Sequence, residues 1–353
     1  MRLNSHMQKA LTALGAEIRE VTALQDNAPE ALAVDFPEWD QLLRQVAVEN
    51  PWFTPAEVTE ALKQWGDCLY PDALESWMQS YPEPEGKPRK VGLVMAGNIP
   101  LVGFHDLLSV LVTGNHAMVR CASNDRRLLP FLWQRLCRYQ PELEGLAGFT
   151  EGRLEAFDAV IATGSNNTAR YFEYYFRDKP HIIRKNRNSI GVLDGEENPE
   201  ALAGLAADVF RYFGMGCRSI SKLMVPEGYD FDPLFQAFYP HRTLLEHPKY
   251  ANNYDYNKAV YLMSGAPMLD NGFLLLKEDS GLGSPIGTLF YEPYASREQV
   301  QRRLAENQAQ LQCVAGPQWV AGAIPFGTTQ KPGLSDYADG VDTVEFLLRI
   351  RAN

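Results

Sequence analysis

The chain has 353 residues, of which 45% are hydrophobic and 22% charged, an ordinary globular composition for two domains or one large domain with lobes. Its net charge of −11 argues against a nucleic-acid partner, because phosphate binding needs a concentrated positive face. The sequence shows neither a run of about 18 apolar residues nor a secretory signal, so we expect no membrane span and a cytoplasmic protein that acts on a small molecule.

Five cysteines are spread along the chain: Cys68, Cys121, Cys137, Cys217 and Cys313. Their odd number and the lack of CxxC spacing predict reduced thiols rather than a disulfide framework or a zinc site. The histidines show no metal-like spacing either. We therefore expect no metal, and at most one cysteine with a function.

Residues 1–86 are predicted to form a helical N-terminal segment. Leu11, Leu14 and Ile18 recur at helical spacing. The run Thr54-Pro55-Ala56-Glu57 has the form of a capping box with proline at the first helical position. Because residues 81–88 are rich in proline and glutamate, we place the first boundary there.

Strands and helices alternate after residue 86. We expect strands at 91–95, 116–120, 157–162 and 189–193, and helices at 100–111, 128–137, 166–174 and 199–213. This alternation predicts an α/β doubly wound unit. The pattern is looser from about residue 214, with strands near 222–225 and 286–291, and predicts a second lobe.

The chain has neither GxGxxG after its first expected strand nor GxxxxGK[ST], so a dinucleotide would bind without the usual glycine fingerprint. Five other segments stand in the order in which aldehyde dehydrogenases carry their motifs, and each resembles one of them: Met95–Pro100, Gly114–Arg120, Ala162–Ser165, Phe213–Cys217 and Pro325–Gly327.

Within that superfamily the chain most resembles the LuxC-type acyl-CoA reductases, which are fatty-acid reductases. The likeness covers roughly residues 90 to 350 and is carried by Arg120–Asp125, by Glu278-Asp279 followed by Ser284–Ile286, and by Gln330-Lys331 with Asp336–Asp342. The resemblance implies an aldehyde-dehydrogenase-like α/β fold. A Rossmann-type dinucleotide-binding lobe is expected over residues 87–205, a catalytic lobe over 206–325, and a C-terminal segment over 326–353 that returns to the cofactor lobe.

Cys217 is the expected nucleophile. It follows Gly214 and Gly216, which allow the backbone to approach a substrate closely. A nearby positive charge from Arg211, Arg218 or Lys222 would favour the thiolate. By resemblance, Asn98 donates to the oxyanion together with the Cys217 backbone N–H, and each such donor is typically worth about 3–4 kcal/mol.

Hydrolytic aldehyde dehydrogenases place a general-base Glu upstream of the cysteine to activate water. An ungapped match onto that segment puts Arg184 where the Glu would be, and no Glu occurs between Glu173 and Glu196. Because general-base catalysis contributes about 10²–10⁴-fold, water attack on an acyl-enzyme should be slow without it. The sequence therefore favours thioester reduction over aldehyde oxidation.

The resemblance also assigns the cofactor contacts. Ser123 takes the place of the Glu that binds the adenosine ribose in NAD-preferring relatives, and Arg120 takes the place of the strand lysine. A guanidinium without that carboxylate would admit a 2′-phosphate, so NADPH is expected, with Asp125 nearby as an opposing charge. Four further cofactor contacts are implied: Gly164, Ser165, Glu278 and Phe326.

We predict NADPH-dependent reduction of an acyl thioester to the aldehyde through an acyl-enzyme on Cys217. The resemblance implies a long-chain acyl group, carried by coenzyme A or by an acyl-transferring partner protein. Two alternatives stay open: an NAD(P)-dependent aldehyde dehydrogenase that makes a carboxylic acid, and a non-catalytic nucleotide-binding relative. The chain is short for the superfamily, which leaves homodimer formation open.

Overall fold

The computed structural model describes residues 1–352. The chain forms two compact units: unit 1 comprises Met1–Lys185 and the segment from Gly333 onward, and unit 2 comprises Asn186–Pro332. The fold is α/β, as the sequence predicts. The units separate after residue 185, earlier than the boundary expected after residue 205, because the next strand pairs with two strands of unit 2.

Unit 1 begins with five helices, over the part of the chain where the sequence predicts helix. They are α1 (Ser5–Asn27), α2 (Pro29–Asp35), α3 (Pro37–Glu49), α4 (Pro55–Cys68) and α5 (Pro71–Gln79). Proline opens four of them, at a position where its missing N–H costs no hydrogen bond. Thr54 caps α4 as predicted, since its Oγ1 accepts from the backbone N–H of Glu57 at 3.3 Å.

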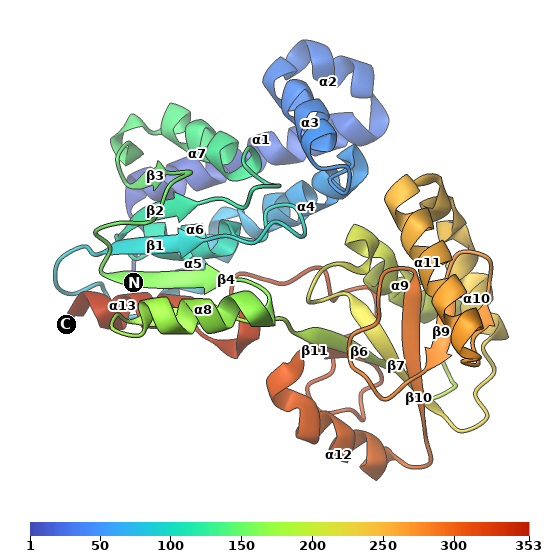
Figure 1. Ribbon diagram of the computed structural model, residues 1–353. Coiled ribbons are helices and arrows are strands. Elements are labelled where there is room, and N and C mark those ends of the chain that lie inside the picture. The colour runs from blue at the N-terminus through green and yellow to red at the C-terminus, as the bar shows by residue number, and fades with distance from the viewer. Residues whose placement is uncertain (353) are drawn as a thin grey trace. The chain divides into compact units, whose positions relative to one another are not determined.

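The core of unit 1 is a parallel sheet in the order β3-β2-β1-β4-β5. Its strands are β1 (Lys90–Val94), β2 (His116–Arg120), β3 (Ala147–Phe149), β4 (Ala159–Thr163) and β5 (His181–Arg184). Its helices are α6 (Phe104–Val112), α7 (Leu128–Tyr139), α8 (Asn166–Phe176) and α13 (Thr343–Ala352), as Figure 1 shows. The strand order reverses between β1 and β4. Such a reversal creates the crevice at the carboxyl ends of the strands where doubly wound sheets bind ligands.

Two sequence predictions for unit 1 need correction. The helix after Pro100 begins only at Phe104, because Leu101 adopts a left-handed φ of 59° that a helix does not allow. The strand expected at 189–193 is β6 (Asn188–Val192) and belongs to the sheet of unit 2. The edge of the first sheet is formed by β5 instead, whose four residues are too few to show a period.

Unit 2 contains a six-stranded sheet in the order β11-β6-β7-β10-β9-β8, parallel except for β8. Besides β6, its strands are β7 (Ile220–Pro226), β8 (Leu269–Asp270), β9 (Leu275–Glu278), β10 (Thr288–Tyr294) and β11 (Leu311–Ala315). Its helices are α9 (Pro199–Phe210), α10 (Asp232–Phe238), α11 (Pro248–Ser264) and α12 (Arg297–Asn307).

Helices cover both faces of the unit 2 sheet, with α9 and α10 on one side and α12 on the other (Figure 1). The alternation along β7 produces the two cores, since successive side chains of a strand point to opposite faces. Leu223 and Val225 pack among the side chains of α9 and α10. Met224, between them in sequence, packs on the other face with Val300 of α12.

Hydrogen bonds tie the segment after Gly333 to the rest of unit 1. The Tyr81 hydroxyl donates to Asp342 at 2.7 Å and lies 2.6 Å from the Tyr337 hydroxyl. Tyr337 also accepts from the indole N–H of Trp77 at 2.7 Å. The last helix therefore belongs to the first sheet's unit although about 150 residues of unit 2 intervene in the sequence.

Candidate active site

The sheet of unit 1 gathers five of the predicted site residues at one edge. Asn98 follows β1, Arg120 ends β2 with Ser123 just after it, and Gly164 and Ser165 follow β4. These three strands are neighbours and parallel, so their carboxyl ends lie together. The edge is also where the strand order reverses, which is the expected position of a dinucleotide site.

The loop that carries Asn98 has a fixed backbone, and Asn98 itself is exposed. The Asn124 side chain donates to the carbonyl of Gly97 at 2.8 Å. A Cβ on Gly97 would collide with that side chain, so only glycine fits at this position. Together with the left-handed Leu101, these contacts hold Asn98 at the carboxyl edge of the sheet.

The two residues expected at the adenosine end of a cofactor, Arg120 and Ser123, are both exposed. Asp125 lies beyond them and is only 7% exposed. Burial raises the pKa of its carboxyl to about 7, although the backbone N–H groups of Leu101 and Leu128 act in the opposite direction. Asp125 is thus a buried carboxyl that carries less negative charge near neutral pH than an exposed aspartate would.

The same carboxyl predicts a dependence of stability on pH. An unfolded Asp titrates near pH 3.9, whereas folded Asp125 titrates at about 7, so the folded state binds the extra proton between these values. The free energy of unfolding should therefore fall as pH rises through this window, by up to about 4 kcal/mol at 1.36 kcal/mol for each pH unit. Asp125→Asn should remove this slope in urea unfolding curves recorded between pH 4 and 8. A slope equal to that of the wild type would contradict the assignment, and the exposed Asp178→Asn serves as control.

In unit 2, the loop between α9 and β7 has an unusual backbone. Tyr212 and Phe213 are consecutive non-glycine residues with left-handed φ angles of 54° and 55°. Such a conformation costs of order 1–3 kcal/mol for each residue and persists only when the surroundings impose it. Both side chains are buried, and the Phe213 ring lies 4.6 Å from the ring of His247. Strain of this kind concentrates at functional sites, and this loop leads to Cys217.

Cys217 is partly exposed at the end of this loop. Its carbonyl oxygen accepts a hydrogen bond from the Ser189 hydroxyl at 2.9 Å. The preceding N–H, of Gly216, donates to Ser219 Oγ at 3.2 Å, and the Ser219 N–H donates back to the Gly216 carbonyl at 3.0 Å. The peptide groups on either side of Cys217 are thus fixed by serines that the sequence analysis did not single out.

The other four cysteines are poor candidates for a thiolate nucleophile. Burial raises the pKa of each of their thiols, to about 11 for Cys68 and about 12 for Cys121. Cys313 lies 3.1 Å from the Ser189 hydroxyl, and its thiol pKa is also raised, chiefly by burial. Because a nucleophilic thiol must ionise, these four positions disfavour covalent catalysis.

Lys222 does not supply a free positive charge to the Cys217 loop. It is fully buried on β7 and forms an ion pair with Glu292 of β10. Burial lowers the pKa of its ammonium group while Glu292 opposes this effect.

Arg184 has a structural environment in unit 1. Its guanidinium donates to Asp106 of α6 at 2.7 Å, to the Ala338 carbonyl at 2.7 Å and to Thr343 Oγ1 at 2.8 Å. The arginine is 4% exposed. The position that a water-activating Glu would occupy thus holds a buried cation, which binds the segment after Gly333 to α6 and to the end of β5.

The two remaining predicted cofactor residues lie in unit 2. Glu278 is exposed at the carboxyl end of β9 and is level with Leu223 of β7, whereas Cys217 precedes β7. Phe326 is partly buried and packs against the core cluster of α9. The structure therefore places Glu278 further along the sheet than the start of β7, and Phe326 beside the helix that leads to the Cys217 loop.

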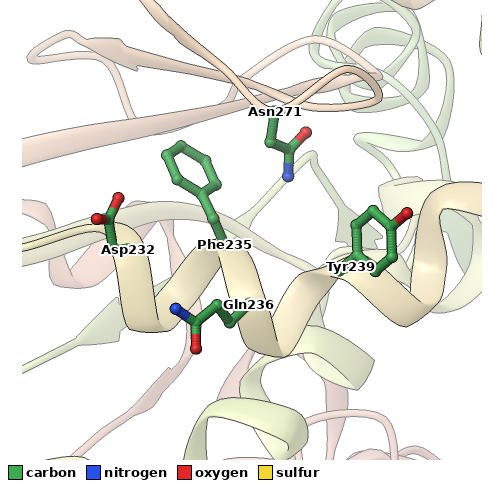
Figure 2. Close-up of a pocket in the computed structure, with 5 residues that line it drawn as sticks. All are labelled: Asp232, Phe235, Gln236, Tyr239 and Asn271. Atoms are coloured by element: carbon green, nitrogen blue, oxygen red, sulfur yellow. The ribbon is translucent and has the colours of Figure 1, made fainter.

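A pocket of about 370 Å³ opens on unit 2 beside α10. Figure 2 shows Asp232, Phe235 and Gln236 on this helix, with Asn271 extending toward them from the opposite wall. None of the predicted site residues lines this pocket.

Across residues 1–352 no group of three or more His, Cys, Asp or Glu side chains is arranged to hold a metal ion. In the same part of the chain no helix is both long and apolar enough to cross a membrane.

One protein-family model matches part of the chain. The model of the acyl-CoA reductase (LuxC) family matches residues 70–233. This range includes both Asn98 and Cys217, but it begins earlier and ends earlier than the likeness read from the motifs. No curated protein sequence matches the chain significantly.

The fold is similar to that of solved aldehyde dehydrogenases. Aldehyde dehydrogenase 21 from Physcomitrella patens, solved with its product succinate, superposes with a TM-score of 0.64 at 13% identity, covering 99% of this chain and 84% of its own. An aldehyde dehydrogenase from Bacillus cereus in complex with NAD+ gives 0.60 at 13% identity, over 88% of this chain and 71% of its own. One from Mycobacterium tuberculosis, also with NAD+, gives 0.54 at 15% identity, over 85% and 77%.

The family match and the fold support an oxidoreductase that acts on acyl or aldehyde groups. The chain thus has the fold of the aldehyde dehydrogenases, and its predicted resemblance to the LuxC-type acyl-CoA reductases is confirmed over residues 70–233.

Proposed function

We propose that the protein reduces an acyl thioester to an aldehyde with NADPH, through an acyl-enzyme on Cys217. The observation that carries the proposal is the position of Cys217, partly exposed at the end of a loop whose backbone is strained at Tyr212 and Phe213. Burial raises the pKa of the other four thiols, and none of them follows such a loop. The family match supports an acyl thioester as the substrate.

In the first half-reaction the Cys217 sulfur attacks the thioester carbonyl carbon and a tetrahedral oxyanion forms. We assign the Asn98 amide and the Cys217 backbone N–H as donors to this oxygen. The bond from carbon to the carrier sulfur then breaks, and the carrier leaves as a thiolate that takes up a proton. The peptide groups on either side of Cys217 are held by the Ser219 N–H and the Ser189 hydroxyl, and they would keep the backbone donor oriented before the substrate arrives.

The residues at the carboxyl edge of the unit 1 sheet fit a dinucleotide phosphate. Arg120 is an exposed guanidinium, and the buried Asp125 does not compete with a bound anion. When bound, NADPH would supply the hydride that converts the acyl-enzyme to a thiohemiacetal, whose collapse returns the Cys217 thiolate and releases the aldehyde. With Arg184 buried against Asp106, the position of the missing Glu offers no base for water. We therefore propose reduction rather than hydrolysis.

A single-turnover experiment tests the proposal. The protein is mixed with radiolabelled acyl-CoA in the absence of cofactor, and the labelled peptide is identified by mass spectrometry. We expect one acyl group for each chain, on Cys217, and release of the aldehyde once NADPH is added. A carboxylic acid as the main product would favour a hydrolytic aldehyde dehydrogenase, and the absence of any acylated cysteine would favour a non-catalytic relative.

Arg120 should set the preference for NADPH. Arg120→Ala removes a charge-assisted hydrogen bond to the 2′-phosphate, which is typically worth about 1.5–3 kcal/mol, or roughly 10- to 100-fold in Kd. The Kd for NADPH, measured by quenching of protein fluorescence, should rise by that factor, while the Kd for NADH should change less than twofold. Arg126→Ala is the matched control, since Arg126 is a neighbouring exposed arginine paired with Glu151. Equal weakening of both cofactors by Arg120→Ala would contradict the assignment.

A further inference from the structure

The Cys217 loop is connected to a distant segment of unit 2 through one glutamine. Gln330 Nε2 donates to Ser219 Oγ at 3.1 Å. The same hydroxyl oxygen accepts the backbone N–H of Gly216 at 3.2 Å, and Ser219 is only 2% exposed. A chain of two hydrogen bonds thus runs from Gln330 to the Met215–Gly216 peptide. The next peptide, between Gly216 and Cys217, is held by the Ser219 backbone N–H, which donates to the Gly216 carbonyl at 3.0 Å.

Gln330 can hold this hydroxyl in place because its own segment is fixed. Asp208 of α9 is 1% exposed and accepts from the Gly327 N–H at 2.7 Å, the Thr329 N–H at 3.1 Å and the Thr329 hydroxyl at 2.8 Å. A Cβ on Gly204 would lie 2.9 Å from the carbonyl group of Phe326, so the segment runs directly against the helix backbone. The residues just before Gln330 are therefore anchored to α9.

The loop needs such support on the side of Cys217. Upstream, the left-handed Tyr212 and Phe213 are held by burial and by the contact of Phe213 with His247. Further along the loop, Gly216 is the residue that most needs hydrogen bonds to fix it, since glycine accepts many backbone conformations. The Ser189 hydroxyl holds the Cys217 carbonyl, and Ser219 holds the Gly216 N–H.

We infer that Gln330 and Ser219 are positioning residues for the nucleophile: they hold the turn from Gly216 to Ser219 that carries Cys217, and so orient the Cys217 N–H and sulfur toward the thioester carbonyl. The inference rests on the proposed role of Cys217 and extends it. Neither residue touches the substrate in this assignment. Loss of the link should therefore slow acyl transfer and leave substrate binding unchanged.

The test measures single-turnover acylation by labelled acyl-CoA without cofactor, and steady-state kcat and KM with NADPH. Gln330→Ala and Ser219→Ala should each lower the acylation rate about 10-fold, because small displacements of a reacting group cost one to two orders of magnitude. The final stoichiometry should stay at one acyl group for each chain, and KM for acyl-CoA should change less than twofold. The double variant should be no slower than either single variant, since both break the same link.

Gln301→Ala, at an exposed position of α12, is the matched control. Gln330→Glu keeps the size of the side chain but cannot donate when ionised, and it provides a second variant if Gln330→Ala fails to fold. An acylation rate within twofold of the wild type in Gln330→Glu or Gln330→Ala would overturn the inference, as would additive losses in the double variant. Failure of the proposed function would give a different experimental result, because the wild-type protein itself would then carry no label on Cys217.

Discussion

If the proposed mechanism holds, replacing Cys217 with alanine should lower kcat for acyl-CoA reduction by about 10⁴-fold or more, because the proposed reaction then loses its covalent nucleophile and keeps only binding and oxyanion stabilisation. The measurement is aldehyde formation and NADPH oxidation under saturating acyl-CoA. Acyl-CoA binding should persist, since the sulfur contributes little to binding the intact thioester. The loss should therefore appear in kcat and not in Kd.

Cys137→Ala is the control for this experiment, because Cys137 is a half-buried thiol of α7 whose pKa is raised by burial. It should retain kcat within a factor of about two. If Cys217→Ala kept a tenth of the wild-type rate, the covalent mechanism would be excluded for this position. A fall of the same size in Cys137→Ala would point to a general effect of cysteine loss on folding.

Arg184→Ala should destabilise unit 1 by about 3–5 kcal/mol, since it leaves the buried Asp106 carboxylate without its cation. The same change frees the Ala338 carbonyl and Thr343, which fasten the segment after Gly333. Urea unfolding followed by circular dichroism measures the loss. Replacing both partners, Arg184→Met with Asp106→Leu, should recover most of the stability, because no buried charge is left unpaired.

Lys185 provides the matched control for this prediction. It is the next residue, and its ion pair with Glu173 is about half exposed on both sides. Exposed pairs contribute little, so Lys185→Ala should cost less than about 1 kcal/mol. Equal effects of Arg184→Ala and Lys185→Ala would show that the buried pair with Asp106 does not stabilise unit 1.

The sequence predicted the α/β fold because the alternation of short apolar strands with helices is a local signal. Thr54 with Glu57, and the strand and helix that start at His116 and Leu128, needed no information from distant residues. The assignment of residues 189–193 to the first sheet was wrong. The sheet to which a strand belongs is decided by the strands that pair with it. The strands that pair with β6 are β7 and β11, and β11 lies more than 100 residues further along the chain.

The residues of the candidate site also form two groups: some could be predicted from the local sequence, and the role of the others depends on the folded chain. Asn98, Arg120 and Gly164 could be proposed because each directly follows or ends a strand of a recognisable motif. Ser189, Ser219 and Gln330 could not, since their importance lies in hydrogen bonds to backbone groups that only the folded chain brings near. The left-handed conformation of Tyr212 and Phe213 was equally invisible, because aromatic residues have no local preference for it and tertiary packing imposes it.

The discontinuity of unit 1 bears on how the chain folds during synthesis. The ribosome delivers residues 186–332 before the segment from Gly333, so unit 2 is complete while unit 1 still lacks α13 and the partners of Tyr81 and Arg184. Translation proceeds at about 5–20 residues per second. For some seconds, therefore, the apolar surface of α6 in the nascent first unit is not covered by α13. Chaperones would find their binding site there, and a stalled or prematurely terminated chain would stay open to proteolysis at that surface.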